Sequence, residues 1–134
     1  MTRRIKPSGF SLGVFMKVII AGGREITDYN AVKVAYEKSG FEATEIVSGA
    51  ARGVDYLGEL LAKNLNITVK RFPADWNTYG KRAGPIRNAE MANYADALIA
   101  VWDGESKGTA NMIVQARQKG LDVFIYLIKG VKNE

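Results

Sequence analysis

The chain has 134 residues, of which 47% are apolar and 25% charged, a balance typical of one globular domain with a real core. Cysteine and histidine are both absent, which excludes disulfides, thiol nucleophiles and thiolate metal sites and removes the usual general base. The formal net charge of +5 suits an anionic partner. We predict no metal site, and we expect no resident cofactor.

The amino-terminal segment, residues 1–15, precedes the first apolar run and carries basic residues such as Arg3 and Lys6. It lacks the apolar stretch of a signal peptide. No run in the chain approaches the roughly 20 apolar residues that span a bilayer. We therefore expect residues 1–15 to be a flexible extension, residues 16–134 to form one domain, and the protein to be cytoplasmic without a membrane partner.

From residue 17 onward, apolar runs of strand length alternate with helical patterns. In chain order the pattern predicts a strand at 17–21, a helix at 28–39, a strand at 43–47, a helix at 53–64, a strand at 67–72, a helix at 85–94, a strand at 97–102, a helix at 109–119 and a strand at 122–127. The first helix has Thr27 or Asp28 as its cap and Gly40 as its stop. Pro85 suits the first turn of the third helix, and Gly120 closes the last.

The second to fifth predicted strands are mostly apolar rather than alternating, which is typical of strands covered on both faces. Strands that alternate with helices favour a doubly wound α/β fold, here a five-stranded parallel sheet with helices on both faces. In such open sheets, ligands bind outside the carboxyl ends of the strands, near the switch in strand order. The loops at that edge are therefore the candidate binding site.

Four loops should share this edge: 22–25, 48–53, 73–84 and 103–109. The segments "SGAARG" and "GESKGT" each enter a helix, whose N–H groups and dipole attract phosphate. Arginine and lysine side chains add charge, and Trp76 and Tyr79 could stack on a base. We predict a ligand site formed by Gly22, Gly23, Arg24, Ser48, Gly49, Arg52, Gly53, Asp55, Trp76, Arg87, Asn88, Gly104, Gly108 and Thr109.

Simpler interpretations stay open for several of these residues. The "SGAARG" segment could be tight packing between a strand and a helix. Trp76 could cap the sheet edge, Asp55 could serve only the helix dipole, and Arg87 could pair with Glu90. The G-x-G-x-x-G and G-x-x-x-x-G-K-[ST] motifs are both absent, which disfavours a standard dehydrogenase or P-loop NTPase.

The order "IIAGGRE", "IVSGAARGVDYLGELLA", "FPADWNTYGKRAGPIRNAEM" and "ADALIAVWDGESKGTANMI" resembles the SLOG superfamily of Rossmann-like proteins, specifically its YspA/YpsA-related branch. The resemblance spans about residues 16 to 128. It implies a pocket that senses or processes a nucleotide-derived ligand, such as a nucleoside phosphate or an ADP-ribose derivative. Relatives commonly form dimers through their helices, so the resemblance also implies a homodimer.

Two better-understood relatives suggest alternatives. The chain is similar to LOG-type phosphoribohydrolases, which cleave N-glycosidic bonds, at Arg87 with Met91 and at Gly108 with Thr109. The family's catalytic glutamate falls on Met112, so Glu105, Asp103 or Glu90 would have to supply the catalytic carboxylate. The stretch from Ser48 to Asp55 is similar to one in DNA-processing protein A, which implies single-stranded nucleic acid binding as a further alternative.

Overall fold

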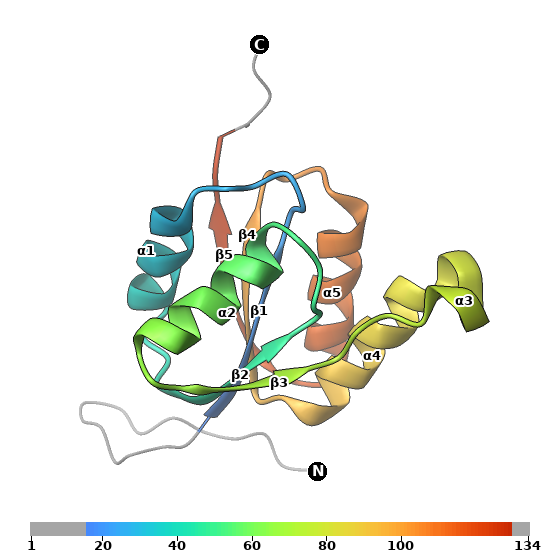
Figure 1. Ribbon diagram of the computed structural model, residues 1–134, viewed down its shortest axis with the longest axis horizontal. Helices are drawn as coiled ribbons and strands as arrows, with labels where there is room; N and C mark the ends of the chain where they lie inside the picture. Colours follow the sequence, from blue (N-terminus) through green and yellow to red (C-terminus); the bar gives the residue numbers. More distant parts are fainter. Residues whose placement is uncertain (1–15, 130–134) are drawn as a thin grey trace.

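A central sheet of five parallel strands runs through the protein in the order β3-β2-β1-β4-β5 (Figure 1). The structure is a computed structural model that describes residues 16–129, and the predicted extension at 1–15 lies outside them. The strands are β1 (Met16–Gly22), β2 (Ala43–Ser48), β3 (Thr68–Arg71), β4 (Ala97–Trp102) and β5 (Asp122–Leu127). The predicted doubly wound α/β fold is confirmed.

Two pairs of helices cover the two faces of this sheet (Figure 1). Helices α1 (Tyr29–Ser39) and α2 (Val54–Asn64) lie on one face, and α4 (Ala83–Tyr94) and α5 (Lys107–Gln118) lie on the other. None of the helices formed by residues 16–129 has the length and apolar character needed to cross a membrane.

Strand β1 shows how the sequence builds both halves of the core. Its side chains alternate between faces: Val18 and Ile20 pack in the cluster under α1 and α2, whereas Ile19 and Ala21 pack under α4 and α5. Burying each valine or isoleucine contributes roughly 1.5 to 3 kcal/mol. The apolar run from Val18 to Ala21 is therefore stable in this strand because helices cover both faces of the sheet.

The ends of α1 follow the predicted signals. Asp28 is the cap, and its Oδ1 accepts a hydrogen bond from the N–H of Asn30 at 2.9 Å. Gly40 ends the helix with a φ of 75°, a left-handed conformation that glycine adopts without steric cost. These local signals depend on neighbouring residues alone, which is why the sequence was sufficient to place them.

Two regions differ from the prediction. Strand β3 is largely exposed instead of covered on both faces, because it lies at one edge of the sheet. The expected long loop at 73–84 contains a short helix, α3 (Trp76–Tyr79), and a 3-10 turn, η1 (Gly80–Arg82). Neither of these two elements has a buried residue, and Figure 1 shows α3 projecting from the end of α4.

The strand order fixes where a ligand can enter. Strands β1 and β4 are hydrogen-bonded neighbours, from Val18 beside Ala97 to Gly22 beside Val101. The chain leaves β1 toward α1 on one face and leaves β4 toward α5 on the other. The loops after these two strands therefore diverge, and a crevice opens between them at the carboxyl edge of the sheet.

Candidate functional site

A cleft of about 580 Å3 occupies this edge of the sheet, within the range of about 300 to 1,000 Å3 typical of small-molecule sites. The predicted site residues that line it are Gly22, Gly23, Arg24, Asp55, Trp76, Arg87, Asn88, Asp103, Gly108 and Thr109. The predicted site residues outside its lining are Ser48, Gly49, Arg52, Gly53, Gly104 and Glu105. Tyr79, expected to help cover a base, does not line it either.

The loops after β1 and β2 are held together by direct backbone contact. The N–H of Val54, the first residue of α2, donates to the carbonyl of Gly23 at 3.2 Å. Gly53 has a φ of 77°, and a Cβ there would overlap the Gly23 carbonyl and the Arg24 backbone. The amino end of α2 is therefore partly closed by the protein itself, and the backbone at Gly53 requires glycine.

Much of the "SGAARG" segment is engaged in internal hydrogen bonds. The Ser48 hydroxyl donates to Glu59 at 2.6 Å and accepts from the N–H of Ala50 at 3.0 Å. Ala50 has a φ of 63°, a left-handed conformation that costs an alanine on the order of 1 kcal/mol. The Ser48 hydroxyl, which was expected to bind the ligand, is thus already used in two hydrogen bonds that hold this segment.

Asp55 is a buried carboxylate in the wall of the cleft. The residue is only 7% exposed, and its Oδ2 accepts a hydrogen bond from the N–H of Ala51 at 3.2 Å. Burial raises the pKa of Asp55 from 3.8 to about 6, although the Ala51 hydrogen bond and the nearby charge of Arg87 oppose this rise. The group is therefore ionised at neutral pH and titrates in mild acid.

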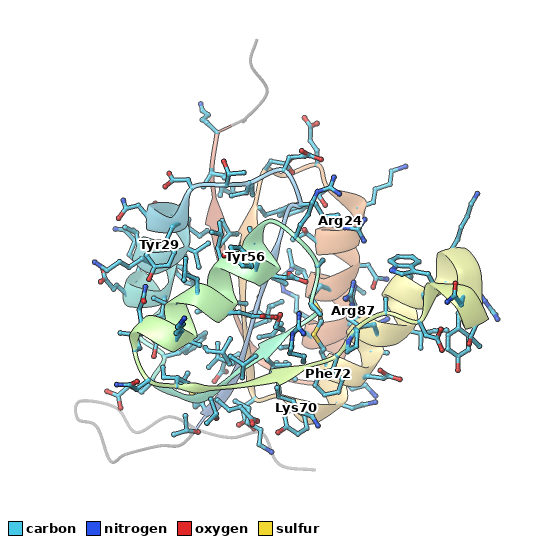
Figure 2. The ribbon with its side chains drawn as sticks, in the orientation of Figure 1. Arg24, Tyr29, Tyr56, Lys70, Phe72 and Arg87 are labelled. Atoms are coloured by element: carbon cyan, nitrogen blue, oxygen red, sulfur yellow. The ribbon has the colours of Figure 1, made fainter. Side chains whose placement is uncertain are left out.

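Arg87 reaches from α4 toward the loop after β2, with Arg24 on the same side of the molecule (Figure 2). Its Nη1 donates to the carbonyl of Gly49, and its Nε donates to Asn88 Oδ1 at 3.1 Å. A Cβ at Gly49 would lie 2.5 Å from this Nη1 and 2.7 Å from Asp55 Oδ2. Glycine is thus needed because the guanidinium and the carboxylate both pack against its backbone.

Asn88 ties this arrangement to α5. It is 6% exposed, and its Nδ2 donates to Asn111 Oδ1 at 3.0 Å and to the Gly108 carbonyl at 3.4 Å. Asn111 also lines the cleft, although it was not among the predicted site residues. Its position three residues after Gly108, on the same face of a helix, was the signal that could have identified it.

The first turn of α5 presents unused donors to the cleft. Ser106 is the cap, and its hydroxyl accepts from the N–H of Thr109 at 3.4 Å. The cap leaves the N–H groups of Lys107 and Gly108 available to a ligand. A Cβ at Gly108 would meet no atom within 4 Å, so the space in front of this turn is open.

Of two arginines from neighbouring loops, one lines the cleft and the other does not. Arg24 lines the cleft, and its guanidinium carbon lies 5.6 Å from the centroid of the Trp76 ring. Trp76 is 47% exposed, so one aromatic surface is accessible at the mouth of the cleft. Arg52 instead pairs with Glu25 at 3.0 Å on the surface, so the charge it was expected to bring to the ligand is directed elsewhere.

Two of the candidate catalytic carboxylates, Asp103 and Glu105, differ in their position relative to the cleft. Asp103 lines the cleft, and its Oδ1 accepts the N–H groups of Glu105 and Ser106 at 2.8 and 2.9 Å. Glu105 does not line it. Met112, which stands where the resemblance implies a catalytic glutamate, lines the cleft and is 1% exposed. A thioether can neither activate water nor stabilise an oxocarbenium ion.

Comparison with known proteins supports the resemblance seen in the sequence. The family model described as "YspA, cpYpsA-related SLOG family" matches residues 16–79, which run from β1 through α3 and carry Arg24, Asp55 and Trp76. The Gene 61 protein of Mycobacterium phage D29 is 32% identical over 117 residues, covering 80% of this chain and 93% of that protein. The similarity to the phage protein thus extends well beyond the segment that the family model matches.

Proposed function

We propose, because this chain belongs to the YspA, cpYpsA-related SLOG family, that its cleft binds a nucleotide-derived small molecule, a nucleoside phosphate or an ADP-ribose type of ligand. Family membership indicates nucleotide-related binding or processing. The observation that carries the proposal is that two cations without an ion pair within residues 16–129, an open helix start and an accessible aromatic ring converge on one cleft of suitable size.

The charges around the cleft favour an anion. Arg24 and Lys107 line it, and neither forms an ion pair within residues 16–129. The acidic residues at its mouth are already engaged: Glu25 pairs with Arg52, and Asp103 accepts two backbone N–H groups. A phosphate placed before the first turn of α5 would receive the N–H groups of Lys107 and Gly108, whose dipole stabilises negative charge.

An aromatic base would complete the fit. Trp76 lines the cleft with an exposed ring, and stacking of a base on an aromatic side chain contributes about 1 to 3 kcal/mol. The phosphate would then lie near α5 and the base near α3. The ribose would lie between them.

A thermal-shift screen at low salt tests this proposal. The probes are the common nucleoside mono-, di- and triphosphates, ADP-ribose, NAD and cyclic nucleotides, because a ligand that binds only the folded state raises Tm by mass action. We expect at least one to raise Tm in the native protein and in Arg117→Ala, and to lose its effect in Arg24→Ala. Arg117 is an exposed cation in the last turn of α5, outside the cleft.

The control variant removes the same charge without touching the cleft. Equal loss of the Tm increase in both variants would mean that net charge rather than the cleft holds the ligand. No increase with any probe, for a folded sample, would argue against a free-nucleotide site. Release of a free base from a bound probe, followed by chromatography, would add catalysis to binding.

A further inference from the structure

The wall of the cleft holds a carboxylate oxygen that has no hydrogen-bond donor among the residues that the structure describes. Asp55 Oδ2 accepts the Ala51 N–H, but Oδ1 accepts no hydrogen bond within residues 16–129. Among these residues, no fully buried side-chain nitrogen or oxygen lacks a partner. Oδ1 is therefore accessible from the cleft that Asp55 lines, although the residue as a whole is more than nine-tenths buried.

A guanidinium group with unused donors lies in the same part of the cleft. Arg87 uses Nη1 for the Gly49 carbonyl and Nε for Asn88, while Nη2 donates to no acceptor in residues 16–129. Arg87 and Asp55 form no ion pair with each other, although both lie against the backbone of Gly49. The two side chains thus offer separate, oppositely charged contacts to whatever enters between them.

Both groups are fixed in place before any ligand arrives. The Ala51 N–H holds the carboxylate, and the Gly49 carbonyl and Asn88 hold the guanidinium. A buried carboxylate without enough donors is unfavourable, which is the reason that its pKa is raised to about 6. A ligand that donates a hydrogen bond to this carboxylate removes the unfavourable term, so the free energy of binding is most favourable for such a ligand.

The chemistry of this pair selects the ligand group that fits it. A phosphate would gain from Arg87 but would be repelled by Asp55, and an apolar group would satisfy neither. A vicinal diol fits best, because its hydroxyls donate to a carboxylate and its oxygens accept from a guanidinium.

We propose that Asp55 and Arg87 bind the 2′- and 3′-hydroxyls of a ribose, so that the site takes ribonucleotides with a free diol and discriminates against their deoxy counterparts. This inference rests on the proposed function, since it assumes that a nucleotide occupies the cleft. A carboxylate that binds a ribose diol is a general device of nucleotide sites in doubly wound folds. Here the carboxylate comes from the start of α2 and not from the end of β2.

The test uses isothermal titration to measure the affinities of ribonucleotides and their deoxy counterparts for the native protein and its variants. The probes are the adenosine, guanosine, cytidine and uridine 5′-mono- and diphosphates, each with its 2′-deoxy and 3′-deoxy counterparts. The proteins are the native chain, Asp55→Asn, Asp55→Ala and the control Arg117→Ala. We expect the native protein and the control to bind the preferred ribonucleotide roughly 10- to 100-fold more tightly than either deoxy form, the effect of one or two hydrogen bonds to charged groups.

In the Asp55 variants we expect that ratio to shrink to a few-fold or less, because the affinity for the ribonucleotide falls more than the affinity for either deoxy form, which keeps one hydroxyl. Retained binding of the deoxy forms shows that the cleft remains folded. If the native protein binds a ribonucleotide and its deoxy forms with equal affinity, the inference is overturned and the proposed function still stands. The same conclusion follows if both Asp55 variants keep the native preference for the ribonucleotide. Failure of every probe to bind the native protein would remove the proposed function and the inference together.

Discussion

At the scale of single residues, Asp55 makes stability depend on pH in an unusual direction. Its pKa in the folded protein, about 6, exceeds its ordinary value of 3.8. The folded state therefore binds more protons than the unfolded state between these two values, and stability falls as pH rises through them. Above about pH 6, the ionised carboxylate costs roughly 3 kcal/mol relative to its protonated form, since each tenfold change in acidity corresponds to about 1.4 kcal/mol.

We therefore expect Asp55→Asn to raise Tm near neutral pH, and to lose this advantage as the pH is lowered to about 4, where the native aspartic acid is itself neutral. Scanning calorimetry across this pH range measures the difference. Glu37→Gln is the control, because Glu37 is an exposed residue of α1 whose one ion pair within residues 16–129 is with Lys33 at 3.9 Å; its effect should stay within about 0.5 kcal/mol throughout. A Tm of Asp55→Asn below that of the native protein near neutral pH would contradict the account.

Gly49 is the second residue on which the site depends. In Gly49→Ala the new Cβ would lie 2.5 Å from Arg87 Nη1 and 2.7 Å from Asp55 Oδ2, so both side chains must move. We expect a loss of roughly 1 to 3 kcal/mol in the free energy of unfolding, together with at least a tenfold loss of nucleotide affinity. Denaturant unfolding and titration calorimetry measure the two effects.

Gly108→Ala is the matched comparison for stability, because a Cβ there meets no atom within 4 Å. It should leave the free energy of unfolding unchanged or raise it by up to about 0.5 kcal/mol. If Gly49→Ala proved equally harmless to stability and binding, the close packing of Arg87 and Asp55 against this glycine would not matter.

At the scale of secondary-structure elements, α3 has no buried residue. Trp76→Ala should therefore change Tm little. It should weaken binding of a nucleotide by roughly 5- to 100-fold if the ring stacks on the base, measured by titration with the nucleotide that gives the largest thermal shift. Tyr79→Ala is the control, since Tyr79 belongs to the same short helix but does not line the cleft. A large drop in Tm for Trp76→Ala would assign the ring a structural role instead.

The elements also show how far the sequence could predict this protein. Caps and stops such as Asp28 and Gly40 are set by local chemistry, so the boundaries of α1 were predictable to within a residue. Helix α3 was missed because four residues with no apolar periodicity give no helical signal. The exposure of β3 was missed because strand order, which puts it at the edge, is a property of the whole fold.

The candidate site was only partly predictable for the same reason. The topology rule placed Arg24, Asp55 and Arg87 at one edge of the sheet, and all three line the cleft. It could not tell that Arg52 pairs with Glu25 or that Ser48 bonds to Glu59, because side-chain direction within a loop depends on neighbours distant in sequence. The interaction of Arg87 with Gly49, which lies 38 residues away, is of this kind.

At the scale of the whole molecule, the charge distribution distinguishes a small-molecule site from a nucleic-acid groove. The net charge of +5 is modest, and Arg3, Arg4 and Lys6 contribute to it from outside the described residues. We expect a fluorescently labelled single-stranded oligonucleotide to bind no more tightly than a nucleoside diphosphate, as measured by anisotropy at low salt. Tight binding that weakens steeply with added salt would instead indicate a groove that follows a phosphate backbone.

The location of the bound nucleotide is the most direct test of the central claim. The measurement is a titration of 15N-labelled protein with the nucleotide that gives the largest thermal shift, followed by amide chemical shifts. We predict that the largest changes fall at the carboxyl edge of the sheet, in residues 22–25 and 106–109, with little change at the opposite edge in residues 38–42 and 119–122. Changes concentrated at that opposite edge or along β3, with the cleft amides unmoved, would contradict the account.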